Sequence, residues 1–291
     1  SHIDKFSLGG SEKAVAYLSK EFPSDYKIYV CGNVEEETFD NVSYIHDSKL
    51  SSLLKENHYH TIIVSRFLSF FKKFPNFSCK QLYIWSHDSI GFIDEIWNSN
   101  IEERKSISKI LDTNNEKITG AISLTEWHKN HICDMYPILK NKINIINNGI
   151  VPSLFENTCK KIKNKFIWTS CSNRGLSVIL NLWNEILTLL PDATLDICSY
   201  HAFPSGKEDD EMNKIILANP SIKHYGKLNI TELYELMSIS EYWLYTNTIA
   251  ESACITAFEM LMSEVICLYY PIAGLVDTIG DYGIKVEKGN E

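Results

Sequence analysis

The alternation of short apolar runs with helix-length segments is the feature that most constrains this fold. The runs predicted as strands are Lys27–Cys31, Thr61–Ser65, Gln81–Trp85, Ala121–Leu124, Ile143–Ile146, Phe166–Ser170, Thr194–Ser199, Ile222–Tyr225, Tyr242–Tyr245 and Val265–Tyr269. The helices predicted between them include Ser11–Glu21, Glu126–Tyr136, Gly175–Leu190 and Thr231–Ser238. Such alternation predicts an α/β protein with parallel sheets covered by helices on both faces. Two Rossmann-like domains fit this length better than one very wide sheet.

A change in composition marks the predicted domain boundary. The segment Asn148–Pro152 contains an Asn-Gly pair and a proline, and a polar, lysine-rich stretch follows it as far as Lys165. Asn-Gly and Pro interrupt regular structure. We therefore predict an N-terminal domain over residues 1–150 and a C-terminal domain over 151–291, facing each other across a cleft. Further along, the charged run Lys207–Glu211 is typical of a solvated loop.

Charge and cysteine usage exclude several classes of partner. The formal net charge is −9, which argues against broad binding to nucleic acid or to an anionic membrane. No apolar run is long enough to cross a bilayer and no signal peptide is recognisable, although a peripheral membrane contact stays open. The eight cysteines form no C-x-x-C pair, which disfavours a zinc ribbon and a thioredoxin-type motif. We expect a reducing, cytoplasmic location.

No metal site is expected from the sequence. His128, His131 and Cys133 fall on one predicted helix, but three such side chains without a distant partner more often form a polar helix face than a metal site.

Two glutamates separated by eight positions mark the candidate ligand site. The apolar run Tyr242–Tyr245 leads into Glu251–Glu259, which we predict to begin a helix. A strand followed by a helix places free backbone N–H groups at the carboxyl edge of a parallel sheet, where phosphates bind. Eight helical residues span about 12 Å, so the two carboxylates could hold hydroxyls at both ends of a nucleotide-sugar. Two solvated glutamates on an amphipathic helix are the alternative.

Taken together, the motifs resemble those of nucleotide-sugar glycosyltransferases with two Rossmann-like domains, the GT-B class, and specifically the retaining, family 4-like group. The resemblance runs from Gly9 to about Lys285. The matching pieces, in the family's order, are Gly9–Glu12 as the glycine loop, Trp85–Asp88 as the histidine motif, Asn147–Pro152 as the Asn-Gly hinge, Cys171–Leu176 as the diphosphate loop, and the pair Glu251 and Glu259.

The resemblance implies a role for each matching residue. His87 would hydrogen-bond the transferred sugar, with Asp88 beside it as orienter or acceptor contact, and Glu251 would bind the same sugar. These three are the predicted catalytic residues. Glu259 would bind the ribose hydroxyls of the donor, and Arg174 would pair with its diphosphate. The predicted donor-binding set is Gly9, Gly10, Ser172, Asn173, Arg174, Ser252, Ala253, Cys254 and Glu259. Candidates for contacts with the base are Tyr200, His201, Tyr225 and Lys227.

The implied activity is transfer of a hexose from a UDP- or GDP-sugar to a glycan, protein or small-molecule acceptor, with retention and without a metal or other cofactor. One departure concerns the diphosphate loop, where the family often has an arginine followed by a lysine and this chain has only Arg174. Another concerns the start of the chain. A first strand would be expected before the glycine loop, and Ser1–Leu8 is a poor candidate for it.

Four other functions compete with this one. A metal-dependent GT-A transferase is disfavoured because no Asp-x-Asp follows a strand, and an NAD-dependent oxidoreductase because Gly-x-Gly-x-x-Gly is absent. A sugar-nucleotide epimerase and a catalytically silent sugar-nucleotide or glycan-binding domain stay open as alternatives.

Overall fold

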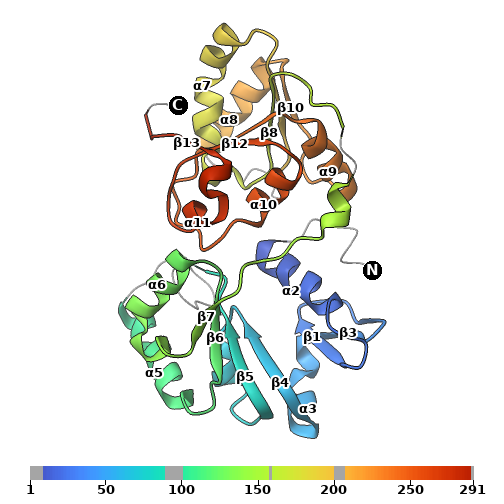
Figure 1. The fold of residues 1–291 in the computed structure, drawn as a ribbon, viewed down its shortest axis with the longest axis vertical. Coiled ribbons are helices and arrows are strands. Elements are labelled where there is room, and N and C mark those ends of the chain that lie inside the picture. Colours follow the sequence, from blue (N-terminus) through green and yellow to red (C-terminus); the bar gives the residue numbers. More distant parts are fainter. Residues whose placement is uncertain (1–8, 89–100, 157–158, 200–206, 290–291) are drawn as a thin grey trace. The chain divides into compact units, whose positions relative to one another are not determined.

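The structure is a computed structural model that describes residues 9–88, 101–156, 159–199 and 207–289. These residues form two compact units, which Figure 1 shows. The N-terminal unit comprises Gly9–Gly149 together with the short segment Glu251–Ala253. The C-terminal unit comprises Ile150–Ala250 and the chain from Cys254 onward. Each unit is described by itself.

The N-terminal unit contains two sheets. Four parallel strands in the order β4-β5-β6-β7 form the larger one, and β1-β3-β2 form the smaller one, in which β2 runs antiparallel to β3. The strands are β1 (Ile28–Gly32), β2 (Glu37–Phe39), β3 (Val42–His46), β4 (His58–Ser65), β5 (Ser78–Trp85), β6 (Gly120–Ser123) and β7 (Ile143–Ile145). The helices are α2 (Gly10–Lys20), α3 (Leu50–Glu56), α4 (Ser69–Lys73), α5 (Ile101–Asn114) and α6 (Glu126–Met135).

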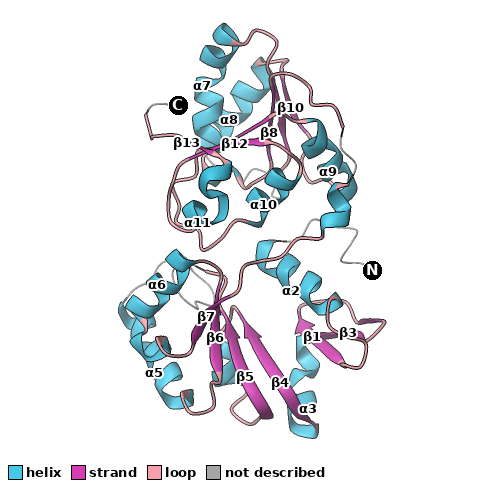
Figure 2. Ribbon diagram, viewed as in Figure 1, coloured by secondary structure: helices cyan, strands magenta, loops and turns pink. Residues whose placement is uncertain are grey.

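The C-terminal unit is built on one six-stranded sheet in the order β10-β9-β8-β11-β12-β13, and every pairing in it is parallel. The strands are β8 (Lys165–Trp168), β9 (Thr194–Ile197), β10 (Ile222–His224), β11 (Tyr242–Tyr245), β12 (Ile266–Tyr269) and β13 (Ile284–Lys285). The helices are α7 (Leu176–Leu189), α8 (Lys207–Ala218), α9 (Ile230–Ile239), α10 (Ile255–Met262) and α11 (Leu275–Ile279). Figure 2 distinguishes these helices from the strands by colour.

Large aromatic side chains fill the core of the C-terminal unit. Trp168, Trp183 and Trp243 are fully buried, and all four residues of β8 are buried. Continuous burial along a strand is expected where helices cover both faces of a parallel sheet, and it explains the apolar sequence of the central strand β11. In this sheet and in the larger N-terminal sheet, the shared parallel direction brings the carboxyl ends of the strands to one edge, where ligands bind in open α/β folds.

The predicted α/β architecture with two Rossmann-like domains is confirmed, and each predicted strand is present with its ends shifted by a few residues at most. The pattern did not predict β2, β3 and β13. Two of these strands, β2 and β13, are only three and two residues long, which is too short to show a period.

Two local predictions are wrong. The run Lys207–Glu211 begins helix α8 and is not a loop, because acidic residues favour the positive end of a helix dipole. The helix predicted from Glu251 begins only at Ile255, and Cys254 before it has extended backbone angles. Glu251 and Glu259 therefore do not lie on one helix, and the separation of about 12 Å expected for eight helical residues does not apply to them.

Within the described part of the chain, no helix combines the length and the apolar character that a membrane-spanning segment needs.

Candidate active site

Parallel pairing gathers functional side chains at one edge of the larger N-terminal sheet. Strand β4 ends at Ser65, β5 at Trp85 and β6 at Ser123, and all three run in the same direction. The residues that follow them therefore meet at the carboxyl edge. They include Arg66 after β4 and the predicted site residues His87 and Asp88 after β5.

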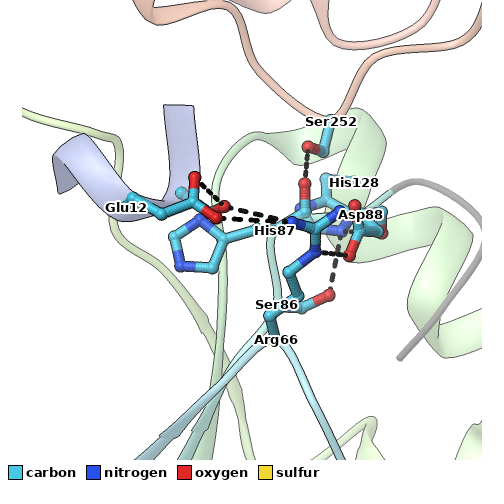
Figure 3. A network of polar contacts seen from close by, with 8 residues as sticks. Glu12, Arg66, Ser86, His87, Asp88, His128 and Ser252 are labelled. Carbon is cyan, nitrogen blue, oxygen red and sulfur yellow. Dashed lines mark hydrogen bonds and ion pairs between the residues drawn. The ribbon is translucent and has the colours of Figure 1, made fainter. Parts of the chain in front are cut away.

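Arg66 connects the ends of β4 and β5 to the first turn of α2. Its Nε donates a hydrogen bond to Asp88 Oδ2 at 2.9 Å, and its guanidinium also donates to Ser11 Oγ at 3.4 Å. A second carboxylate oxygen, Glu12 Oε1, lies 3.7 Å from the guanidinium. Figure 3 shows the arginine between these acidic groups. One cation thus balances two carboxylates from different elements, and such charge-assisted contacts are stronger than neutral ones.

A buried histidine fixes the main chain on the other side of Asp88. The Nδ1 of His128 accepts a hydrogen bond from the backbone N–H of Leu124 at 3.2 Å, so the ring proton is on Nε2. That Nε2 lies 3.0 Å from the carbonyl oxygen of Asp88 and 3.3 Å from Ser86 Oγ. Burial lowers the pKa of His128 to about 4, so the ring is neutral at pH 7. Thr125 caps the helix by accepting a hydrogen bond from the N–H of His128.

His87 is also neutral. Burial, and after it the positive charge of Arg66, lower the pKa of His87 to about 3. The ring packs against Trp85 with 4.5 Å between ring centroids. Its buried Nε2 has no hydrogen-bond partner among the residues that the structure describes. A buried polar nitrogen without a partner is costly, and a sugar hydroxyl could satisfy it.

The segment Glu251–Ala253 belongs to the N-terminal unit through Ser252. The hydroxyl of Ser252 donates to the carbonyl oxygen of His87 at 2.5 Å, and its own carbonyl oxygen accepts from the hydroxyl of Thr125 at 2.8 Å. These hydrogen bonds hold the segment in a non-helical path, which is the physical reason why the helix starts later than predicted. They also place Glu251, Ser252 and Ala253 in the same unit as His87 and Asp88.

The glycine loop forms the beginning of α2. Gly9 is the N-cap and Gly10 the first helical residue, and the N–H of Lys13 bonds to the carbonyl oxygen of Gly9. A side chain at Gly9 would overlap the Glu12 carboxylate, so the glycine leaves room for Glu12 beside Arg66. Both predicted glycines therefore lie next to the Arg66 contacts.

In the C-terminal unit, the predicted diphosphate loop lies at the carboxyl end of β8. Ser172–Arg174 form one 3₁₀ turn, with Ser172 and Arg174 partly buried and Asn173 exposed. Gly175 follows in the left-handed conformation with φ +105°, and its carbonyl oxygen accepts a hydrogen bond from the Thr246 hydroxyl at 2.7 Å. A Cβ at this position would overlap the Thr246 carbonyl group. Only glycine allows this close approach of the loops after β8 and β11.

Glu259 on α10 is almost completely buried, with 1% of its surface exposed. Its Oε1 accepts a hydrogen bond from the hydroxyl of Tyr234 on α9 at 2.8 Å, and Phe155 packs on that tyrosine with 4.7 Å between ring centroids. Cys254 is the buried N-cap of the same helix. Of the three residues predicted to offer backbone N–H groups from the helix start, only Cys254 adjoins α10, because Ser252 and Ala253 precede it.

Among the candidates for contacts with the base, Tyr225 and Lys227 lie in the loop after β10, on either side of Gly226. Tyr200 and His201 lie outside the described residues. No group of three or more His, Cys, Asp or Glu side chains within the described ranges has the geometry of a metal site.

Sequence reasoning missed Arg66, and it missed the role of His128 beside Asp88. The sequence does contain a signal that could have identified Arg66, because this residue directly follows the apolar run Thr61–Ser65. His87 likewise follows the run Gln81–Trp85, with one residue between. The sequence contains no such signal for His128, since its partners Asp88 and Ser86 are 40 and 42 positions away along the chain.

Solved glycosyltransferase structures share this fold. A glycosyltransferase from Rickettsia africae ESF-5 matches with a TM-score of 0.65 and 14% identity, over 97% of this chain and 80% of that one. HepE from Anabaena, solved with UDP and glucose, matches with a TM-score of 0.63 and 13% identity, over 94% of this chain and 80% of that one. TarM matches with a TM-score of 0.59 and 16% identity, over 79% of this chain.

The chain spans about half the length of TarM, since the match covers 45% of that protein. No protein-family model and no curated protein sequence matches this chain. At such low identities the structural likeness establishes the fold, which is that of the GT-B glycosyltransferases.

Proposed function

We propose that this protein is a glycosyltransferase that moves a hexose from a nucleotide-diphosphate sugar to a hydroxyl-bearing acceptor. The observation that carries the proposal is the likeness, over almost the whole chain, to glycosyltransferase structures such as HepE, which was solved with UDP and glucose. UDP is therefore the first nucleotide to test, and GDP the second. The acceptor can be a glycan, a protein or a small molecule.

The C-terminal unit supplies the charged groups for the donor. Cleavage of a sugar–diphosphate bond develops negative charge on the leaving phosphate, and fixed cations and N–H dipoles stabilise that charge. Arg174 and its neighbours Ser172 and Asn173 follow β8 at the carboxyl edge of the sheet, where phosphates bind in such folds. In this proposal Cys254 contributes its backbone N–H group and Glu259 binds the ribose hydroxyls.

The N-terminal unit supplies the groups for the transferred sugar. The neutral His87, whose Nε2 has no partner among the described residues, donates or accepts a hydrogen bond at a sugar hydroxyl. Glu251 binds the same sugar, and Asp88 orients the site or contacts the acceptor. We propose that transfer occurs with retention at the anomeric carbon and needs no metal ion. The remaining donor contacts would come from backbone groups, at Gly9, Gly10, Ser252 and Ala253.

Calorimetric titration with UDP and GDP, each with and without EDTA, tests the donor site. We expect one nucleotide to bind equally well with and without EDTA. Arg174→Ala and Glu259→Ala should each weaken that binding by about tenfold or more, because each removes a charge-assisted hydrogen bond. Lys214→Ala, which removes an exposed cation on α8, is the matched control and should bind like the wild type. Failure of both nucleotides to bind would overturn the proposal.

NMR of the reaction products tests the chemistry. Incubation with UDP-glucose and an acceptor should give a product with the anomeric configuration of the donor. An inverted product would contradict retention, and a new UDP-sugar without transfer would indicate the epimerase instead.

A further inference from the structure

Arg66 has a backbone conformation that arginine rarely adopts. Its φ is +67°, in the left-handed region, directly after the end of β4. Its N–H donates to the carbonyl oxygen of Trp85 at 2.9 Å, so the strained residue is tied to the end of β5. Strain of this kind persists only where the surrounding structure enforces it, and it is common at functional sites.

The side chain of Arg66 reaches two acidic residues that are distant in sequence. Asp88 lies 22 positions away and bonds to Nε at 2.9 Å, while Glu12 lies 3.7 Å from the guanidinium. The side chain of Arg66 is 28% exposed and that of Asp88 is 22% exposed, so water and salt screen this pair only in part. Lysine has a single ammonium group and could not make the same set of contacts.

We propose that Arg66 is a positioning residue for the transfer reaction, which fixes the Asp88 carboxylate and the first turn of α2 relative to His87. The inference rests on the proposed function, in which His87 and Asp88 contact the sugar and the acceptor. It assigns Arg66 no contact with the substrate. Among the described residues, the charged or titratable side chains that surround His87 in these contacts are Arg66, Asp88, Glu12 and His128.

Kinetics of three variants test the role in catalysis. The assay measures UDP release from UDP-glucose, and calorimetry measures UDP binding. Arg66→Gln should lower kcat by up to about 100-fold, because a small displacement of a catalytic group has an effect of that size. UDP affinity should change less than about twofold, since the charged donor groups lie in the C-terminal unit. Arg66→Lys should recover part of the loss. Lys55→Gln, which makes the same change in charge at an exposed position on α3, should behave like the wild type.

Titration of His87 by NMR tests the same contacts without any substrate. Removal of the Arg66 charge leaves the carboxylates of Asp88 and Glu12 without this counter-charge near His87. The pKa of His87 should therefore rise in Arg66→Gln and stay unchanged in Lys55→Gln. This measurement separates the two proposals. If the wild type binds neither UDP nor GDP and turns over neither UDP-glucose nor GDP-glucose, the proposed function fails, and the His87 titration still decides whether Arg66 acts on His87.

The inference is overturned if Arg66→Gln keeps kcat within about twofold of the wild type in an active enzyme, or if it leaves the pKa of His87 unchanged. If Arg66→Gln does not fold, Arg66→Lys gives the kinetic measurement, because lysine keeps the positive charge near His87 but not the paired contacts of the guanidinium. A smaller loss of kcat is then the expected result, and no loss is the contrary one.

Discussion

The two units stabilise their strand-end loops by different means. In the C-terminal unit the loops after β8 and β11 meet through backbone contact at Gly175 and Thr246. In the N-terminal unit the corresponding edge depends on Arg66, two carboxylates and two neutral histidines. The first arrangement depends on shape and the second on charge. They should therefore respond differently to mutation, pH and salt.

The C-terminal unit also contains a charged contact, but it lies within the sheet and not in the strand-end loops. Lys165 Nζ on β8 lies 2.6 Å from Asp196 Oδ2 on the neighbouring β9, and both side chains are almost buried. Asp196→Ala leaves the ammonium buried without this partner and should lower the free energy of unfolding by about 3–5 kcal/mol. Hydrogen exchange measured on peptides from β8 and β9 checks this.

The control for that prediction is the double variant Lys165→Met, Asp196→Leu. Replacement of a buried ion pair by apolar residues of similar size is often neutral, so the double variant should be more stable than Asp196→Ala. If Asp196→Ala alone exchanges like the wild type, the pair is not buried in solution.

The shape-dependent contact at Gly175 should show the next largest effect. In Gly175→Ala, an alanine would have to adopt a positive φ and its Cβ would overlap the Thr246 carbonyl group. This variant should lower the free energy of unfolding by about 2–4 kcal/mol. Gly226→Ala is the control, because Gly226 also has a positive φ but nothing within 4 Å of a Cβ. Chemical denaturation should show a larger loss for Gly175→Ala. Equal losses would mean that only the backbone angle matters.

Local pattern predicted the strands well because buried parallel strands are continuous apolar runs. It placed His87 and Arg174 after strand ends for the same reason, since the end of an apolar run marks where a strand stops. It could not predict that Ser252 bonds to His87, because that contact joins residues 165 positions apart. The late start of α10 follows from this long-range contact, and propensity alone carries no information about it.

The burial of Glu259 could not be predicted from the sequence either. The spacing of Glu251 and Glu259 left open whether they hold a nucleotide-sugar or are two solvated glutamates, and it gave no sign that Tyr234 from another helix covers Glu259. Chemistry that depends on which side chain faces which partner requires the tertiary structure.

The contacts around His87 and His128 should lose stability in acid. The two histidines have folded-state pKa values of about 3 and about 4, below the ordinary value of 6.5. Between pH 6.5 and these folded-state values, the histidines of the unfolded chain bind protons that those of the folded chain do not. The contribution of the two histidines to stability is therefore complete above about pH 6.5 and falls as the pH falls. As the pH falls through this window, each histidine should lower the free energy of unfolding by up to about 1.4 kcal/mol per pH unit.

Hydrogen exchange at pH 7 and pH 5, corrected for the intrinsic exchange rate, measures this difference unit by unit. Peptides from β5 and α6 should lose more protection than peptides from β8 and β11. His128→Gln should reduce the pH dependence, because it removes one of the two groups. In the C-terminal unit, partial burial also lowers the pKa of His224, but its exposed position on β10 makes the effect smaller. Equal acid sensitivity in both units would contradict the contrast between charge and shape.

The smallest effect concerns the buried carboxylate of Glu259. Tyr234→Phe removes the hydroxyl that donates to Glu259 and should lower the free energy of unfolding by about 1–2 kcal/mol. Tyr282→Phe, at a tyrosine that is 86% exposed, is the control and should be neutral. If Glu259 also binds the donor ribose, Tyr234→Phe should weaken UDP binding as well, because the carboxylate loses a contact that orients it. A loss of stability with unchanged UDP affinity would assign Glu259 to the core of the C-terminal unit, and would leave Arg174 as the residue on which the donor site depends.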